Sequence, residues 1–383
     1  MRRRDALTAA LAWAATGDAV LAQHVPAVAV AQATKPAKAP RIEPRPLHFP
    51  ADFGSHPEHQ TEWWYLTGWV QVAGAPGATP RTFGFQVTFF RSRTGFDAPG
   101  SRFSPQQLVF AHTALSDLSA GRQRHDQRIA RSGFGVSAST TDTDVALRDW
   151  SLVRTGPVDA SGYRAKVRSA SGGFGFDFEL AGTQPTLLQG KSGFSQKGPD
   201  PTQASHYYSH PQLALTGALT LDGQRLTVVG KGWLDHEWSD AVMAPDAVGW
   251  DWIGMNLDDG SALTAFQLRR ADGSALYAGG SWRGPSGALR NFSAADVRFT
   301  AGRQWKSPAS GASYPVAWTI DTPEGNFSVT ALLDAQEQDS RASTGAFYWE
   351  GLSELRRSST GGDSTKVGRG YLEMTGYVQR LRL

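Results

Sequence analysis

The densest group of side chains able to do chemistry in this sequence is the run Asp235-His236-Glu237-Trp238, which directly follows Trp233-Leu234. Carboxylates and imidazoles donate and accept protons near neutral pH, and indole rings contact apolar or cationic groups. Because side chains alternate across a strand, His236 and Trp238 project together, whereas Asp235 and Glu237 project to the other side. The run is therefore a candidate site; carboxylates at a strand end that cap neighbouring backbone are the alternative.

A second candidate is Asp251, on the strand-like run that begins at Trp250. It shares a strand face with Ile253, Met255 and Leu257. A carboxylate on an apolar face must be paired, or its pKa rises until it holds a proton near neutrality. A protonated carboxyl can act as a general acid, so we consider Asp251 a candidate acid. A buried aspartate bonded to backbone amides or to an arginine is the alternative.

Two further runs carry polar groups among aromatic rings. In Glu62-Trp63-Trp64-Tyr65, alternation places Glu62 and Trp64 on one face and Trp63 and Tyr65 on the other. One face can line a ligand cavity, or both can be core packing. His112 has apolar neighbours on its face, so it is either a hydrogen-bonded core histidine or a polar anchor in a mostly apolar pocket.

Residue spacing argues against metal and nucleophile chemistry. His206 and His210 are four residues apart, but Pro211 indicates an extended segment, on which that spacing does not bring two side chains together. The absence of cysteine excludes disulfides, thiol catalysis and zinc–thiolate sites. The chain also lacks the G-x-S-x-G motif of many Ser–His–Asp hydrolases. We therefore expect neither a metal nor another cofactor.

The elements that must position these groups are β-strands. Short apolar runs recur along the chain between Gly, Pro, Asp and Ser, and no long stretch has helical periodicity. Asp222-Gly223, Asp259-Gly260 and Asp272-Gly273 are typical of hairpin turns. The 383 residues are too many for one core, since single cores stop growing near roughly 250–300 residues. We expect an all-β protein of two tandem antiparallel barrels, over residues 47–240 and 241–383.

The N-terminal residues predict export. Met1-Arg2-Arg3-Arg4 is basic and contains an arginine pair, and Val20-Leu21-Ala22 offers the small residues that a signal peptidase reads. We predict a signal peptide over residues 1–22, of the twin-arginine type, and a flexible Ala- and Pro-rich linker over residues 23–46. The mature protein is expected in the periplasm or outside the cell.

Charge and hydropathy narrow the choice of partners. There are 38 basic and 35 acidic residues, and only 19% of residues are charged. This balance gives no electrostatic footprint for nucleic acid, so we expect no nucleic-acid partner. No segment after the signal peptide has the ~18 consecutive apolar residues of a membrane span, so we expect no transmembrane segment in the mature chain.

Seven motifs of the sequence carry a family resemblance. They are Glu62-Trp63-Trp64-Tyr65, Ala111-His112, His206-Tyr207-Tyr208-Ser209, Trp233-Leu234-Asp235-His236-Glu237-Trp238, Gly249-Trp250-Asp251-Trp252, Tyr348-Trp349-Glu350-Gly351 and Gly370-Tyr371-Leu372-Glu373-Met374-Thr375-Gly376-Tyr377. In this order they resemble the AttH/CrtC family of AttH-like exported proteins, carotenoid 1,2-hydratases (hydroxyneurosporene synthases) and pericyclase-like fungal proteins. The resemblance covers residues 47–383 and implies two lipocalin-like barrels. In the hydratase branch a His-x-Trp pair and a downstream Asp serve the active site, which implies such roles for His236, Trp238 and Asp251.

The chemistry of alkene hydration agrees with that implication. An acid must protonate carbon, aromatic rings can stabilise the resulting cation by about 1–2 kcal/mol each, and a base must activate water. Asp251 would be the acid, Trp238 and Trp250 the rings, and His236 or Glu237 the base. Further groups expected to contact the ligand are His112, Glu62, Trp64, Tyr65 and Asp235.

Three functional hypotheses remain open from the sequence. The first is an exported AttH-like protein that binds an apolar small molecule or lipid between two barrels, as an accessory to an ABC transporter permease. The second is a cofactor-independent hydratase or isomerase-type enzyme that acts on a polyene or terpenoid-like substrate. The third is a protein that binds or cleaves glycans through its tryptophans and carboxylates.

Overall fold

The computed structural model describes residues 39–72, 80–95, 105–241, 243–359 and 363–380. Over these ranges the protein is all-β, as predicted, and its helical elements are two short 3-10 turns, η1 (Ala51–Phe53) and η2 (Val158–Ala160). The predicted signal peptide and most of the predicted linker lie outside the described residues. No helix in the described part of the chain is long and apolar enough to cross a membrane.

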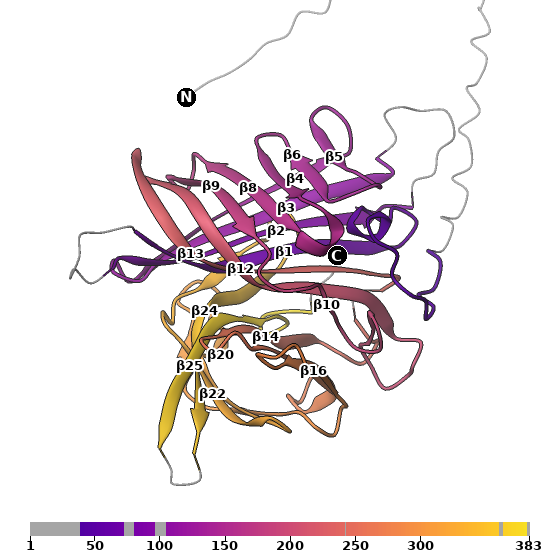
Figure 1. Cartoon of the computed structure of the whole chain (residues 1–383), viewed down its shortest axis with the longest axis vertical. Coiled ribbons are helices and arrows are strands. Elements are labelled where there is room, and N and C mark those ends of the chain that lie inside the picture. The colour runs from indigo at the N-terminus through magenta and orange to yellow at the C-terminus, as the bar shows by residue number, and fades with distance from the viewer. Residues whose placement is uncertain (1–38, 73–79, 96–104, 242, 360–362, 381–383) are drawn as a thin grey trace, which may run out of the picture. The chain divides into compact units, whose positions relative to one another are not determined.

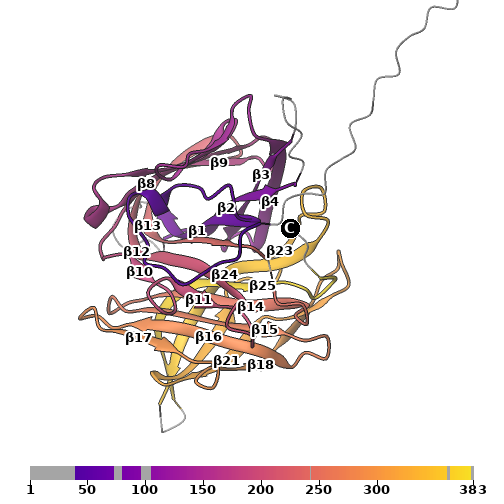
Figure 2. The same ribbon diagram turned by 90° about the vertical axis from the view of Figure 1, so that its right-hand side faces the viewer.

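The first sheet, called sheet A, is a nearly closed antiparallel barrel of thirteen strands (Figures 1 and 2). Its strand order is β4-β3-β2-β1-β13-β12-β9-β8-β7-β6-β5, and β10 and β11 pair with β12. Beside the open edge, Arg128 of β4 pairs with Asp149 and lies over the ring of Trp150. The strands are β1 (Thr61–Val72), β2 (Thr82–Arg93), β3 (Gln107–Asp117), β4 (Arg122–Arg131), β5 (Val136–Ala138), β6 (Asp144–Leu147), β7 (Trp150–Thr155), β8 (Gly162–Ser169), β9 (Phe174–Ala181), β10 (Leu187–Leu188), β11 (Phe194–Gln196), β12 (Ala204–Leu221) and β13 (Gln224–Ser239).

The second sheet, called sheet B, is a large antiparallel sheet of ten strands in the order β17-β16-β15-β14-β25-β24-β22-β21-β18, with β23 on β24. The remaining strands, β19 (Gln304–Lys306) and β20 (Ser313–Pro315), pair with each other. The structure therefore supports the prediction of two antiparallel β bodies. One of them is a nearly closed barrel and the other is a large sheet. The strands of sheet B are β14 (Gly249–Leu257), β15 (Ala262–Arg269), β16 (Ala275–Arg283), β17 (Leu289–Phe292), β18 (Arg298–Ala301), β21 (Ala317–Thr322), β22 (Gly325–Ala331), β23 (Glu337–Asp339), β24 (Phe347–Ser358) and β25 (Ser364–Met374).

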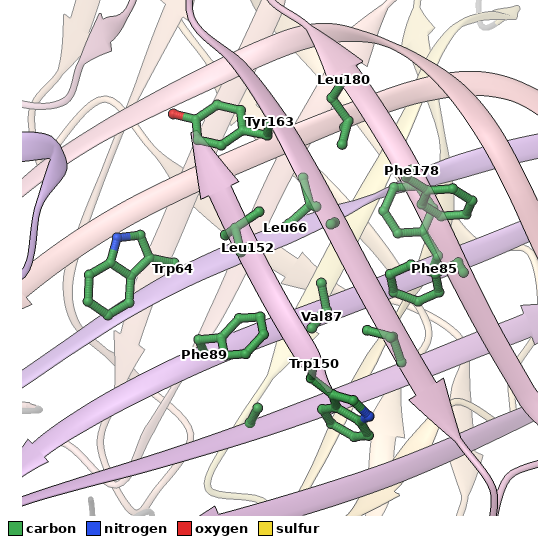
Figure 3. Close-up of a cluster of buried hydrophobic side chains, with 14 of the residues drawn as sticks. Trp64, Leu66, Phe85, Val87, Phe89, Trp150, Leu152, Tyr163, Phe178 and Leu180 are labelled. Atoms are coloured by element: carbon green, nitrogen blue, oxygen red, sulfur yellow. The ribbon is translucent and has the colours of Figure 1, made fainter. Parts of the chain in front are cut away.

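Side-chain alternation fills the inside of sheet A with apolar groups (Figure 3). Trp64 and Leu66 of β1 point to this side, and so do Phe85, Val87 and Phe89 of β2. All five are fully buried. Burying each such side chain contributes roughly 1.5–3 kcal/mol to the stability of the fold. The inward face of β1 and β2 is therefore part of the hydrophobic core.

The hairpin between β12 and β13 sets the register of the sheet near the candidate residues. Its turn residues Asp222 and Gly223 have φ values of 49° and 83°, and two positive φ angles are what the Asp-Gly type I′ turn requires. Together with a bulge further along β12, this turn places Ser209 opposite Asp235.

The outward face of β1 and β13 packs against sheet B. Tyr65 and Trp233 share a hydrophobic cluster with Trp252 and Leu352. The contact is also close at Gly84 of β2, where an added Cβ would lie 2.8 Å from Leu352 Cβ. Both sheets belong to one compact unit of the chain, and their contact creates the site described next.

Candidate functional site

A cavity lies between the outward face of sheet A and strands β14, β15, β24 and β25 of sheet B. The space between its lining residues amounts to about 1030 Å³, a volume that includes open solvent. Aromatic rings make much of its wall, among them Trp63, Tyr65, Phe90, Trp250, Trp252 and Phe266. Its ionisable groups include His112, Lys197, Asp235, Glu237, Glu350 and Glu373. Apolar rings with a few convergent polar groups are the usual composition of a small-molecule site.

Strand pairing brings the carboxyl groups of β13 to this cavity. Asp235 lies opposite Tyr65 of β1, and Glu237 lies opposite Trp63, so these side chains project from one face of the sheet. That face is the outer one, because Trp64, which lies between Trp63 and Tyr65 on β1, points into the core of sheet A.

Asp235 is a buried carboxyl on the cavity wall. Its Oδ1 accepts hydrogen bonds from Ser209 Oγ at 2.5 Å and from Trp233 Nε1 at 2.8 Å. These bonds favour the ionised form, but burial outweighs them and raises the pKa of Asp235 to about 7. The side chain can therefore hold a proton near neutral pH.

Glu350 and Glu373 form a second, paired acid. They lie directly opposite each other on β24 and β25, and both line the cavity. Burial raises the pKa of both groups, that of Glu373 to about 7, and the charge of Glu373 raises the pKa of Glu350 further. Two neighbouring carboxyls, one buried and one half-buried, cannot both ionise without a large cost. The pair therefore retains a proton near neutral pH.

His112 connects the two sheets as a neutral imidazole. Its Nδ1 lies 2.9 Å from the Tyr348 hydroxyl, and its Nε2 lies 2.8 Å from Ser343 Oγ. Burial lowers the pKa of His112 to about 3. Both ring nitrogens thus have protein partners, as in the alternative of a hydrogen-bonded core histidine, and the ring also lines the cavity.

Glu237 has a different environment from the other acids. Ser205 Oγ donates to its Oε1 at 2.5 Å, and Lys197 Nζ lies 3.1 Å from the same oxygen. The ammonium group of Lys197 also lies 4.5 Å from the ring centres of Tyr207 and Phe266. The cavity thus combines an ion pair with carboxyls whose pKa values are raised.

His236, Glu62, Trp64 and Trp238 lie on the opposite side of the strands, within the interior of sheet A. His236 Nε2 lies 2.8 Å from Glu62 Oε1, and its Nδ1 lies 2.9 Å from the Tyr208 hydroxyl. Trp64 stacks on His236 at 4.6 Å between ring centres. None of the four lines the cavity.

Within the described residues, His56, Glu62 and His236 form a group that could hold a metal ion, since one ligand atom of each lies within 4.8 Å of the others. Hydrogen bonding already uses these atoms, because Glu62 Oε1 lies 2.8 Å from His56 Nδ1 and from His236 Nε2. Arg91 Nε also donates to Glu62 Oε2 at 2.8 Å. Although burial acts the other way, these bonds from the histidines hold the pKa of Glu62 below its ordinary value. The contacts describe a hydrogen-bonded ion cluster, and the expectation of no metal stays a prediction.

Asp251 lies away from the cavity and is paired. Its Oδ2 lies 2.8 Å from Arg269 Nε and accepts from Gln267 Nε2 at 2.8 Å, while the Tyr377 hydroxyl donates to Oδ1 at 2.8 Å. Burial raises the pKa of Asp251 in spite of Arg269. These contacts match the alternative of a buried aspartate bonded to an arginine. The adjacent Trp250 does line the cavity.

The structure therefore divides the residues selected from the sequence into two groups. Those brought together at the cavity are Asp235, Glu237, Trp250, His112 and Tyr65. Those placed elsewhere are Asp251, His236, Trp238, Glu62 and Trp64. The functional roles assigned to both groups remain predictions.

Glu350 and Glu373 are cavity residues that the sequence reasoning missed. A signal for them was present, because Tyr348-Trp349-Glu350 and Tyr371-Leu372-Glu373 each place a carboxylate two residues after a tyrosine in a short, otherwise apolar run. A carboxylate among apolar residues must be paired or protonated, and this holds for Glu350 and Glu373 as it does for Asp251.

Comparison with known proteins agrees with this architecture. The model of the AttH-like family matches residues 40–377. A Nitrosomonas europaea protein described as AttH has a crystal structure that is 45% identical in sequence, with a TM-score of 0.79, covering 89% of this chain and 100% of that one. No curated protein gives a significant sequence match.

Two more distant structures share the fold. Kievitone hydratase from Nectria haematococca is 14% identical, with a TM-score of 0.65, covering 90% of this chain and 98% of that one. CghA with Sch210972 is 12% identical, with a TM-score of 0.52, covering 83% of this chain and 89% of that one. Because the family model spans nearly all of the described residues, the chain belongs to the AttH-like family.

Proposed function

We propose that this protein binds a mostly apolar small molecule in the cavity between its sheets and catalyses acid-dependent addition or removal of water at an alkene of that molecule. The observation that carries the proposal is the Glu350–Glu373 pair, which is held opposite across two strands on a cavity wall and retains a proton near neutral pH. Asp235 supplies a second buried carboxyl with a raised pKa in the same cavity.

The proposed reaction uses the groups that line the cavity. A carboxyl of the Glu350–Glu373 pair donates its proton to one alkene carbon and leaves a cation on the other. The indole faces of Trp250 and Trp252 stabilise this cation, by roughly 0.5–2 kcal/mol each. Water adds to the cation and gives a proton to Glu237, and proton exchange with solvent restores the acid. The sum is one water added across one double bond, and the reverse steps remove it.

The walls support an apolar ligand rather than a glycan. Sugar sites surround their carboxylates with many exposed polar donors, whereas Asp235 and Glu350 are buried and Glu373 is half-buried beside aromatic rings. The same fold carries a hydratase in kievitone hydratase. This likeness supports the fold as a suitable scaffold, and the reaction is proposed from the residues of the cavity.

Oxygen isotope incorporation tests the proposed reaction. Prenylated phenols and isoprenoid alkenes are incubated with the protein in H₂¹⁸O, and products are examined by mass spectrometry. We expect the wild type to form an alcohol that carries ¹⁸O, and Glu373→Gln to lower the rate at least 100-fold, because general acid catalysis contributes about 10²–10⁴-fold. Glu237→Gln should also lower the rate. Equal rates in the wild type and Glu373→Gln would contradict the proposal.

Ligand carriage without turnover is the second candidate function. The aromatic walls favour it, because they bind an apolar molecule whether or not a proton moves. In this form the chain is an exported protein with two lipocalin-like barrels that delivers its ligand to an ABC transporter permease. Retention of an unchanged apolar molecule by both the wild type and Glu373→Gln is the outcome that favours carriage.

A further inference from the structure

The cavity contains two buried polar atoms without a hydrogen-bond partner among the described residues. They are the hydroxyl oxygen of Tyr65 and Oε1 of Glu350. Tyr65 is 5% exposed and Glu350 is 1% exposed, and both line the cavity. Buried polar groups are usually hydrogen-bonded, and each one left unpaired is costly.

Tyr65 and Glu350 lie within reach of each other on the cavity wall, although no hydrogen bond joins the two unpaired atoms in the structure. Burial raises the pKa of Tyr65, and the charge of Glu350 and its hydrogen-bonding capacity raise that pKa further. The other oxygen of Glu350 is engaged, because Gln338 Nε2 donates to Oε2 at 3.4 Å. The neighbouring Tyr348 hydroxyl is also engaged, with His112 Nδ1 at 2.9 Å. The free hydrogen-bonding capacity on this part of the wall therefore belongs to Tyr65 and Glu350.

We infer that Tyr65 and Glu350 form a polar clamp for an uncharged hydroxyl group of the ligand, so that the substrate class is a mostly apolar alcohol or phenol rather than a hydrocarbon. This inference rests on the proposed function, because it concerns the ligand of the same cavity. A hydroxyl group fits both partners, since it accepts from the Tyr65 O–H and can also hydrogen-bond with Glu350. A carboxylate is disfavoured, because the acidic residues Glu350, Glu373 and Asp235 line the same cavity.

Two C15 isoprenoids that differ by one hydroxyl group test the clamp. Farnesol and farnesene are titrated against the full chain, and quenching of tryptophan fluorescence reports binding. We expect the wild type to bind farnesol at least 10-fold more tightly than farnesene, because farnesene leaves both atoms of the clamp unpaired. Tyr65→Phe should weaken farnesol binding to within about threefold of farnesene.

Tyr163→Phe is the matched control, because Tyr163 is buried in sheet A and its hydroxyl is bonded to His210 Nδ1 at 2.7 Å. It should keep the full preference for farnesol. Glu350→Gln, with its melting temperature measured alongside, reports the clamp independently of Tyr65 and should retain part of the preference, since an amide still hydrogen-bonds a hydroxyl.

The possible outcomes distinguish a failure of the polar clamp from a failure of the proposed apolar ligand site. Equal affinity of the wild type for the two isoprenoids, or an unchanged preference in Tyr65→Phe, would overturn the clamp while leaving an apolar binding site in place. Failure of both molecules to bind would overturn the apolar ligand site itself.

Discussion

At the scale of single residues, the neighbours of a buried carboxyl decide what it can do. Asp235 and Asp251 are both buried and both have raised pKa values. They differ in their neighbours, since Asp251 lies beside Arg269 and Asp235 faces a cavity of aromatic rings. Only the second environment can deliver a proton to a bound molecule.

The raised pKa of Asp235 predicts a pH-dependent contribution to stability. The folded protein keeps the Asp235 proton up to about pH 7, whereas an unfolded aspartate releases it near pH 4. Stability from this group is therefore complete below pH 4 and is lost as pH rises toward 7, by at most about 1.4 kcal/mol per pH unit.

Urea unfolding of the wild type and Asp235→Asn between pH 4 and 8 measures this effect. An asparagine oxygen still accepts from Ser209 and Trp233, so the variant should fold. We expect the wild type to lose stability relative to the variant as pH rises from about 4 to 7. A difference in unfolding free energy that stays constant over this range would show that Asp235 is not protonated in the folded protein.

At the scale of strands, the alternation of side chains could be predicted from the sequence. Which face of a strand packs against the second sheet could not be predicted. The sequence separates Trp63 and Tyr65 from Glu62 and Trp64, and the structure keeps that separation. Both faces carry aromatic rings, so hydropathy does not tell which one looks toward a second sheet. For this reason the residues selected on β1 and β13 fall partly in the cavity and partly in the interior of sheet A.

Pairing between distant strands is the other feature that the sequence hides. Glu350 and Glu373 are separated by a hairpin, and they become a coupled acid only because the register of β24 and β25 sets them opposite each other. Asp251 meets Arg269 in the same way, through the pairing of β14 with β15. Such pairs depend on register, which a single run of residues does not reveal.

Strand β2 gives a prediction for the packing of the two sheets. A Cβ at Gly84 would lie 2.8 Å from Leu352 Cβ and 2.9 Å from the Tyr371 hydroxyl, so Gly84→Ala must push sheet B away. We expect a loss of about 1–3 kcal/mol in the free energy of unfolding, the usual cost of overpacking. Gly284→Ala is the control, because its nearest neighbour, Trp282 Nε1, is at an ordinary 3.5 Å. Equal stability of the two variants in urea unfolding would contradict the close contact.

At the scale of the whole molecule, the site exists only because two β bodies share one chain. Sheet A contributes Asp235, Glu237 and Tyr65 to the cavity, and sheet B contributes Glu350 and Glu373. The all-β class and the expectation of more than one β body could be predicted from length, turn residues and the lack of helical periodicity. The cavity could not, because it depends on which outer faces of the two bodies meet.

The central claim is that this cavity holds a neutral carboxylic acid near neutral pH. Infrared spectroscopy measures it directly, because the C=O stretch of a protonated carboxyl is resolved from that of a carboxylate and shifts in D₂O. We predict such a band in the wild type near neutral pH and a clear loss of its intensity in Glu350→Gln/Glu373→Gln. Absence of the band from the wild type, or an identical band in the double variant, would contradict the account.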